Sequence, residues 1–267
     1  MTMVIHPTAL VDPKAEIDGS VEIGPYCVIG PRVRIGAGCR LHERVSIDGQ
    51  TTLGRDNHVF PGACIGLPPQ DITYHDADTR VEIGDDNLIR EYVTIHRGTE
   101  KGGGVTTIGS HNFLMVMAHV AHDCLIEDHV LLENNVLLAG HIHVEHHAVV
   151  SGGAAMHHFT TVGCFSFVGG LTRIVHDVPP YMKVEGHPAR VRGVNVVGLR
   201  RHGVAEETVS RLVEAYRHLY CYGQPRSLTL PQLEAHADQP EEVQHLLASL
   251  RRSDLGKHGR YRESLRK

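Results

Sequence analysis

The chain has 267 residues and a formal net charge of −5 with histidine neutral, so it lacks the basic surplus that nucleic-acid binding requires. Tryptophan is absent and aromatic residues make up 5%, so we expect a core of aliphatic side chains. We see no signal peptide and no apolar stretch suited to stable membrane insertion, and the six cysteines are scattered without a Cys-x-x-Cys pair. This pattern fits reduced thiols, and we expect a cytoplasmic protein.

An aliphatic residue recurs every six residues through the first two-thirds of the chain. The positions that share this phase run over residues 5–65, 83–95 and 108–174. A small or β-branched residue commonly stands two positions before each of them. A period of six suits neither a helix nor a hairpin, but it is typical of a parallel β-helix whose coil has three short sides. One aliphatic and one small residue per side then point into a narrow prism.

The phase of this repeat places three cysteines, Cys27, Cys39 and Cys124, in small inward slots, which makes them core residues rather than redox groups. The repeat resembles that of the hexapeptide-repeat acyltransferases. This resemblance implies a mainly β fold, a single-stranded left-handed parallel β-helix. The general preference for right-handed crossovers would have predicted the opposite hand.

Two loops interrupt the repeat, and a helical region follows it. The phase breaks at residues 66–82, which contain paired prolines, and at 97–107, which contain Gly102-Gly103-Gly104. Loops ejected from a solenoid are commonly functional. Beyond Asp177-Val178-Pro179-Pro180-Tyr181 the apolar residues take a helical period. We therefore predict a β-helix domain over 1–190 and a small α-helical C-terminal domain over 191–267, with the basic tail from 251 onwards a solvated, fraying end.

Five histidines fall along one side of the predicted prism and its adjoining corner. Residues 18 apart in such a β-helix stack on the same side, about 4.8 Å apart. On this register His122, Gly140 and His158 coincide, and the rest of the column lies beside them: His119, His141 and His157. A chain with 22 histidines will show some clusters by chance, but the stacked set favours a functional site.

Neutral imidazoles in a cluster suit either metal ligation or general base chemistry. A metal site needs three side chains that converge on one point at about 2 Å, and the carbonic-anhydrase-like proteins of this fold use histidines in this way. Asp123 follows His122 directly and favours the base. A carboxylate that is hydrogen-bonded to the imidazole fixes its tautomer and stabilises the imidazolium.

Several segments together resemble the UDP-N-acetylglucosamine 3-O-acyltransferase family, which starts lipid A synthesis. They are Thr94-Ile95-His96-Arg97-Gly98, Ala118-His119-Val120-Ala121-His122-Asp123-Cys124, Leu138-Ala139-Gly140-His141, Asp177-Val178-Pro179-Pro180-Tyr181, Gly193-Val194-Asn195 and Gly198-Leu199-Arg200-Arg201. The likeness covers nearly the full chain and both loops, so it is far more specific than the repeat alone.

The resemblance implies transfer of an (R)-3-hydroxyacyl group from acyl carrier protein to the 3-hydroxyl of UDP-N-acetylglucosamine, with no cofactor and no metal. His122 matches the family's base, Asp123 its orienting carboxylate, and the backbone N–H of Gly140 its oxyanion donor. The matched substrate-binding positions are Gln70, Asp71, His96, His119, His141, His157, His158, Asn195 and Arg201. Gly170 matches the position that limits acyl length, and it implies a long chain, about C14 rather than C10.

Two positions depart from the family pattern. Thr73 stands where a lysine is common, which removes a cation expected near the nucleotide phosphates, and Val197 stands where a glutamate is common. The alternative acceptor is therefore a UDP-3-amino sugar, whose product would be an amide.

The family is a homotrimer with its sites between subunits, and a convex prism face also needs a second wall to form a pocket. A carbonic-anhydrase-like metalloenzyme and a purely structural solenoid are the remaining hypotheses.

Overall fold

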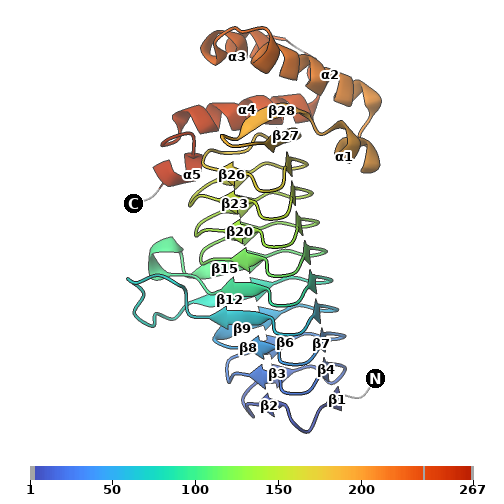
Figure 1. The fold of residues 1–267 in the computed structure, drawn as a ribbon, viewed down its shortest axis with the longest axis vertical. Helices are drawn as coiled ribbons and strands as arrows, with labels where there is room; N and C mark the ends of the chain where they lie inside the picture. The colour runs from blue at the N-terminus through green and yellow to red at the C-terminus, as the bar shows by residue number, and fades with distance from the viewer. Residues whose placement is uncertain (1–3, 237, 266–267) are drawn as a thin grey trace.

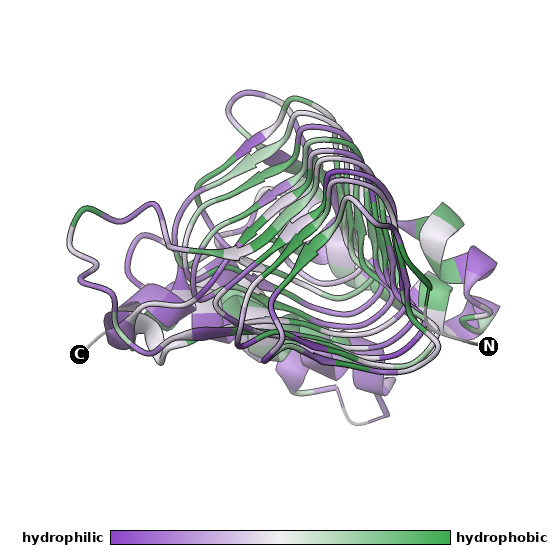
Figure 2. Ribbon diagram, turned by 90° about the horizontal axis from the view of Figure 1, so that it is seen from below, coloured by the Kyte–Doolittle hydropathy of each residue, from purple (hydrophilic) through white to green (hydrophobic). Residues whose placement is uncertain are grey.

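The structure is a computed structural model that describes residues 4–236 and 238–265. Its longest part is a triangular prism of short strands, seen from the side in Figure 1 and along its length in Figure 2. As far as Ile174, successive strands visit the three faces in turn, and strands on one face pair in parallel, 18 residues apart where no loop intervenes, as between His119 and Leu137. The last two strands, Met182–Glu185 and Arg190–Val194, pair antiparallel. The predicted left-handed parallel β-helix is confirmed.

Each face of the prism is one sheet. The first sheet holds β1 (Val4–Ile5), β4 (Glu22–Ile23), β7 (Arg40–Leu41), β10 (His58–Val59), β13 (Leu88–Ile89), β16 (Phe113–Leu114), β19 (Leu131–Leu132), β22 (Val149–Val150), β25 (Phe167–Val168), β27 (Met182–Glu185) and β28 (Arg190–Val194). The second holds β2 (Leu10–Val11), β5 (Val28–Ile29), β8 (Ser46–Ile47), β11 (Cys64–Leu67), β14 (Thr94–His96), β17 (His119–Val120), β20 (Leu137–Leu138), β23 (Ala155–Met156) and β26 (Arg173–Ile174). The third holds β3 (Glu16–Ile17), β6 (Arg34–Ile35), β9 (Gln50–Leu53), β12 (Arg80–Ile83), β15 (Val105–Ile108), β18 (Leu125–Ile126), β21 (His143–Val144) and β24 (Thr161–Val162).

The second residue of most strands is the aliphatic residue of the repeat, and it points into the prism. Ile65, Ile95 and Val120 stack in this way on the second sheet and are fully buried. Burial of each such side chain is worth about 1.5–3 kcal/mol, so the column is the main source of stability. Cys27, Cys39 and Cys124 are buried in the inward slots, as predicted.

Two loops leave the prism at the same edge, between the second and third sheets (Figure 1). The first loop, residues 68–79, follows β11, and the second loop, residues 97–104, follows β14 and contains the 3₁₀ turn η1 (Glu100–Gly102). Arg80–Ile83 and Val105–Ile108, which flank the loops, pair with each other as strands β12 and β15. The coils therefore close again in register after each loop.

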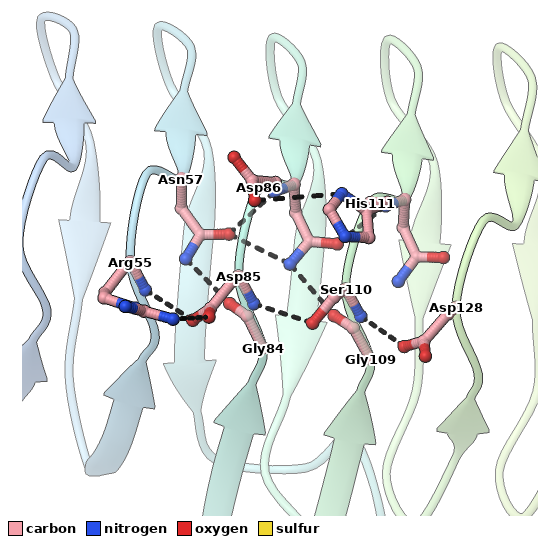
Figure 3. A network of polar contacts seen from close by, with 11 residues as sticks. Arg55, Asn57, Gly84, Asp85, Asp86, Gly109, Ser110, His111 and Asp128 are labelled. Atoms are coloured by element: carbon pink, nitrogen blue, oxygen red, sulfur yellow. Dashed lines mark hydrogen bonds and ion pairs between the residues drawn. The ribbon is translucent and has the colours of Figure 1, made fainter.

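A ladder of buried asparagines holds that register at another edge of the prism, between the third and first sheets (Figure 3). The side-chain oxygen of Asn57 accepts from the backbone N–H of Asn87, 30 residues later, at 3.0 Å. The side-chain oxygen of Asn87 accepts from the N–H of Asn112, 25 residues later, at 2.9 Å. The spacing exceeds 18 at both steps because each loop adds residues to its coil, so the ladder joins the coils that carry the loops.

Helices cover one end of the prism (Figure 1). They are α1 (Val196–Arg201), α2 (Glu206–Tyr216) with its π-helical continuation η2 (Arg217–Cys221), α3 (Arg226–Glu234), α4 (Glu241–Leu255) and α5 (Tyr261–Ser264). Leu212 and Leu246 belong to a second hydrophobic cluster, and Nδ1 of His245 lies 3.0 Å from the Tyr181 hydroxyl, which ties α4 to the last coil. The boundary predicted at residue 191 falls within β28, and the division into two domains stays a prediction.

The basic tail is not a fraying end where the structure describes it. Helix α4 continues to Leu255, and the following segment folds back onto the last coil. Nη1 of Arg260 donates to the Val175 carbonyl at 2.7 Å, and the N–H of Tyr261 donates to the Asp177 carboxylate at 2.9 Å. These specific bonds outweigh the solvation of the charged side chains. Residues 266 and 267 lie outside the described part. Among the described helices, none is long and apolar enough to cross a membrane.

Candidate active site

The predicted histidines gather along the edge from which both loops leave. We call this the histidine edge; it consists of the three stacked turns 121–124, 139–142 and 157–160. Asp123, His141 and Phe159 occupy equivalent places in these turns, and all three have a positive φ near 60°. This left-handed conformation is uncommon outside glycine, although Asp and His tolerate it better than most residues. It lets each turn direct the chain tightly from the second sheet to the third.

His122 and Asp123 form a directly hydrogen-bonded pair. Nδ1 of His122 donates to Oδ2 of Asp123 at 2.7 Å, and the Asp123 side chain is fully buried. Thr99, from the second loop, donates its backbone N–H to Oδ1 at 2.9 Å and its hydroxyl to Oδ2 at 2.6 Å. The carboxylate is therefore fixed from two sides. The remaining nitrogen of His122, Nε2, makes no hydrogen bond within the described residues, so it is available to a substrate.

Glycines allow the second loop to close over this carboxylate. A Cβ on Gly102 would lie 2.0 Å from Cγ of Asp123, and a Cβ on Gly98 would lie 2.3 Å from the backbone nitrogen of Val105. Neither contact is compatible with a side chain. Close packing thus requires glycine at positions 98 and 102, whereas Gly103 and Gly104 stand where the backbone has a positive φ, 97° and 81°.

Gly140 lies directly against the His122 ring, as the repeat register predicted. A Cβ at this position would lie 2.5 Å from Cε1 of His122, so only glycine leaves room for the imidazole. In the described part of the chain the backbone N–H of Gly140 donates to no acceptor, whereas its carbonyl accepts from Phe159 at 3.2 Å. A free N–H beside the imidazole is what stabilisation of an oxyanion requires.

His141 packs at right angles to His122 and stacks on Phe159, with ring centroids 5.1 and 4.3 Å apart. Its Nε2 lies 3.8 Å from Oδ2 of Asp123. Burial lowers the pKa of His141 to about 4, although the nearby Asp123 carboxylate acts in the opposite direction. His141 is therefore neutral at pH 7 and can donate or accept a hydrogen bond.

A second histidine pair lies beside this group on the second sheet. The rings of His96 and His119 meet edge to face at 5.4 Å. Nδ1 of His96 donates to the Pro68 carbonyl of the first loop at 2.6 Å, and Nδ1 of His119 shares a 2.7 Å hydrogen bond with the Thr94 hydroxyl. Burial lowers the pKa of both imidazoles. His96 thus also anchors the first loop.

The groove along the histidine edge consists of two adjoining cavities. One, of about 430 Å³, is lined by Gln70, Asp71, Ile72, His122, His141, His157, His158, Phe159 and Glu263. The other, of about 540 Å³, shares Asp71, His141 and Phe159 with it. Asp71 accepts from both the backbone N–H and the hydroxyl of Thr73 at 2.8 Å, and these bonds lower its pKa. Six of the thirteen predicted site residues therefore line this groove. Four more lie beside it: Asp123, Gly140, His96 and His119.

Three predicted residues lie elsewhere in the chain. Gly170 follows β25, at the edge between the first and second sheets. Asn195 caps α1, and its side chain donates to the Phe165 carbonyl at 2.9 Å and accepts from the N–H of Gly198 at 3.2 Å. Arg201 is exposed at the end of the same helix. Within one chain, none of the three lines the two cavities of the histidine edge.

The loss of a cation at Thr73 is offset by a lysine from the other loop. Nζ of Lys101 donates to Oγ1 of Thr73 at 2.7 Å. The prediction that this place lacks a cation was therefore wrong, because the repeat does not reveal which loop residues meet.

Thr99, Phe159 and Arg262 are further groove residues that sequence reasoning missed. Thr99 precedes a glycine-rich run, which was the one available signal.

A metal fits this group poorly. Ligand atoms of His122, Asp123 and His141 do lie within 4.8 Å of one another. However, the 2.7 Å His122–Asp123 distance is that of a hydrogen bond, and Thr99 already donates to both carboxylate oxygens. Bound ligands would have to turn toward a common centre at about 2 Å, which these bonds oppose. The hydrogen bonds of His122 and Asp123 suit proton transfer better than metal binding.

Comparison with known proteins adds independent evidence. Residues 177–258 match the family model described as UDP N-acetylglucosamine O-acyltransferase, domain 2. The acyl-[acyl-carrier-protein]–UDP-N-acetylglucosamine O-acyltransferase of Synechocystis sp. is 46% identical over 217 residues, which cover 80% of this chain and 78% of the relative. The UDP-N-acetylglucosamine O-acyltransferase of Moraxella catarrhalis RH4 matches with a TM-score of 0.88 and 42% identity over 93% of this chain and 96% of that structure. The UDP-N-acetylglucosamine acyltransferase of Bacteroides fragilis 9343 matches with a TM-score of 0.90 and 37% identity over 93% and 97%. The chain belongs to the UDP-N-acetylglucosamine O-acyltransferase family.

Proposed function

We propose that the groove of the histidine edge carries out acyl transfer, with His122 as the general base. As a member of its family the chain is an acyltransferase that moves an acyl group from acyl carrier protein to UDP-N-acetylglucosamine, the first step of lipid A synthesis. The single observation that supports the assignment of the base best is the 2.7 Å bond between His122 and the buried Asp123. That bond holds a proton on Nδ1 and leaves Nε2 as a base.

In the proposed mechanism a sugar hydroxyl, which we take to be the 3-hydroxyl, gives its proton to Nε2 of His122. The oxygen then attacks the thioester carbonyl of an (R)-3-hydroxyacyl carrier protein. The oxyanion that forms accepts a hydrogen bond from the N–H of Gly140, a contact whose loss typically costs about 10²–10³-fold in rate. Collapse breaks the C–S bond, and the leaving thiolate takes the proton from the imidazolium. Asp123 stabilises that imidazolium throughout.

Substrate binding falls to the remaining groove residues in this proposal. Gln70 and Asp71 of the first loop face the sugar nucleotide, and His141 offers a neutral imidazole to a sugar hydroxyl or carbonyl. His157 and His158 line the same cavity as His122, and His96 and His119 extend the polar surface along the second sheet. The chemistry assigned to these residues requires neither a cofactor nor a metal.

We also propose a homotrimer in the cytoplasm, where acyl carrier protein and nucleotide sugars are available. Asn195 and Arg201 lie away from the histidine edge of their own chain, so in this proposal they serve the groove of a neighbouring copy.

Gly170 lies at the opposite edge of the second sheet, where a Cβ would meet only the Gly152 carbonyl at 3.2 Å. Such an open position is consistent with the long acyl chain, about C14, that we propose.

The alternative acceptor is a UDP-3-amino sugar, which would yield an amide. The deciding experiment offers UDP-N-acetylglucosamine and its 3-amino analogue in parallel, each with 3-hydroxyacyl carrier proteins of several chain lengths. We expect an ester product, cleaved by mild alkali, with the highest kcat/KM for the C14 donor. An alkali-stable amide as the main product would favour the alternative, and transfer to neither acceptor would overturn the proposal.

A further inference from the structure

Two cations, Lys101 and Arg262, face the larger of the two cavities of the histidine edge and come from distant parts of the chain. That cavity is lined by Asp71, Thr73, Thr99, Lys101, Gly102, His141, Phe159, Arg262 and Leu265. Lys101 belongs to the second loop, and Arg262 belongs to α5, the segment of the tail that folds back. Among the described residues neither cation forms an ion pair, although Asp71 acts on Lys101 and Asp177 acts on Arg262 at longer range.

Lys101 is held by a neutral group. Its ammonium donates one hydrogen bond to Oγ1 of Thr73 at 2.7 Å, and Thr73 in turn donates to Asp71 at 2.8 Å. An ammonium has three N–H donors, so two remain available to a ligand. The hydrogen bond also joins the two loops and fixes the charge at the wall of the cavity.

Arg262 is held by the prism itself. Its Nε donates to the His141 carbonyl at 3.2 Å, and within the described residues its Nη groups donate to no acceptor, so they can make a planar, bidentate contact with a ligand. The guanidinium is half-buried, and this burial lowers its pKa. The Asp177 carboxylate acts on it only at longer range, and a half-buried cation that lacks a directly paired anion is costly unless a ligand supplies the negative charge. The nearby Arg260, by contrast, is paired with Glu263.

The charges around this cavity favour an anion. Asp71 is the one carboxylate among its lining residues, and it is already engaged by Thr73. His141 is neutral at pH 7, so among the lining residues the two cations exceed the single anion; the buried Asp123 beneath them is held by His122 and Thr99. We propose that Lys101 and Arg262 together bind a phosphate group of a substrate. This inference rests on the function proposed above, in which the sugar nucleotide carries a diphosphate and the carrier protein's pantetheine arm carries a phosphodiester.

Direct binding distinguishes the two sources of phosphate. UDP and 4′-phosphopantetheine are each titrated by calorimetry into the full-length wild type, Lys101→Met, Arg262→Gln and the double variant. We expect about a tenfold rise in Kd for each cation removed, with a Kd that also rises with salt. Weakening for UDP alone assigns the site to the nucleotide, and weakening for phosphopantetheine alone assigns it to the carrier arm. Unchanged Kd values for both ligands overturn the proposal.

Matched variants separate charge from structure. Arg262→Lys keeps the charge and should hold Kd within about threefold of the wild type, whereas Arg262→Gln keeps a side-chain N–H donor but no charge. Equal weakening in both would mean that Arg262 only supports the fold, which contradicts the proposal. Lys183→Met, at an exposed position on β27, removes a distant lysine and should change neither Kd. The titrations measure binding without turnover. A wild type that binds these ligands but transfers no acyl group would therefore overturn the proposed function and not the phosphate site.

Discussion

Asp123 shows how much of the chemistry depends on a single buried carboxylate. Three hydrogen bonds converge on it: one from His122 and two from Thr99. Its own backbone N–H donates to the Thr106 hydroxyl at 2.8 Å. A carboxylate held in this way cannot turn aside when His122 takes a proton, so the imidazolium meets a fixed negative charge. Such preorganisation is worth more in a buried site than in water.

Replacement of Thr99 by valine tests this arrangement. Thr99→Val removes the 2.6 Å hydroxyl bond to Asp123 but keeps the backbone N–H bond. We expect kcat to fall about tenfold, which corresponds to about 1.4 kcal/mol. Thr51→Val is the control, because it removes a 2.6 Å hydroxyl bond to the Asp48 carbonyl, also from a buried threonine, and does not touch the Asp123 carboxylate. Similar kcat values for the two variants would contradict a role for Thr99 in positioning Asp123.

The neutral state of His141 makes stability depend on pH. Its folded-state pKa of about 4 lies below the usual value of 6.5, so the unfolded chain binds this proton more readily. The free energy of unfolding should therefore decrease as the pH falls from about 6.5 to about 4. His141→Phe, which resembles Phe159 one coil further on, should make that decrease less steep. Chemical denaturation at several pH values measures both slopes, and equal slopes would count against this assignment.

At the scale of elements, the asparagine ladder secures the coils that carry the two loops. The side chain of Asn87 bonds to Asn57, to the Gly109 carbonyl and to the backbone of Asn112. Without it, the Gly109 carbonyl and the Asn112 N–H would lose these bonds, and Asn57 Oδ1 would keep only the bond from the Asn87 backbone N–H. The ladder thus keeps the loops at the height of the prism where they reach the histidine edge.

Asn87→Ala should be strongly destabilising. We expect a loss of about 2–4 kcal/mol in the free energy of unfolding, because buried groups are left unsatisfied in addition to the lost bonds. Asn134→Ala, at an exposed position, should change the same quantity by less than about 0.5 kcal/mol. Urea denaturation followed by circular dichroism gives both values. A cost below 1 kcal/mol for Asn87→Ala would show that the ladder is dispensable.

The repeat made the prism and its histidine column predictable, because a period of six determines which residues share a side. The stacking of Gly140 against His122 follows from their 18-residue separation. The contacts of Thr99, Lys101 and Arg262 did not follow. Their positions depend on how two loops and a returning tail fold, and no periodic pattern governs those segments. The basic composition of the tail suggested a solvated end, but backbone bonds to the last coil and the buried Arg260 hold it in place.

At the scale of the whole molecule, the groove is a shallow feature on the outside of a prism. Leu137 on the second sheet and Leu171 at its edge with the first sheet are exposed large aliphatic side chains. Exposed apolar residues in such a setting favour an interface with another protein surface. A second copy of the chain would supply the missing wall, in keeping with the proposed trimer.

Leu137→Asp should break that assembly. We expect the wild type to have about three times the 29.4 kDa mass of the chain by light scattering, and the variant to have about the mass of one chain with little remaining activity. Leu228→Asp places the same charge on an exposed position of α3, away from the second sheet, and should remain trimeric. A variant at position 137 that stays trimeric would exclude this face from the interface.

The base assignment is tested most directly by His122→Ala. Initial rates of acyl transfer from 3-hydroxyacyl carrier protein to UDP-N-acetylglucosamine are measured for the wild type and the variant at pH 7, after circular dichroism confirms that both are folded. Because the variant has no group to accept the hydroxyl proton, kcat should fall by about 10²–10⁴-fold while UDP still binds. A folded His122→Ala variant that retained the turnover of the wild type would contradict the account.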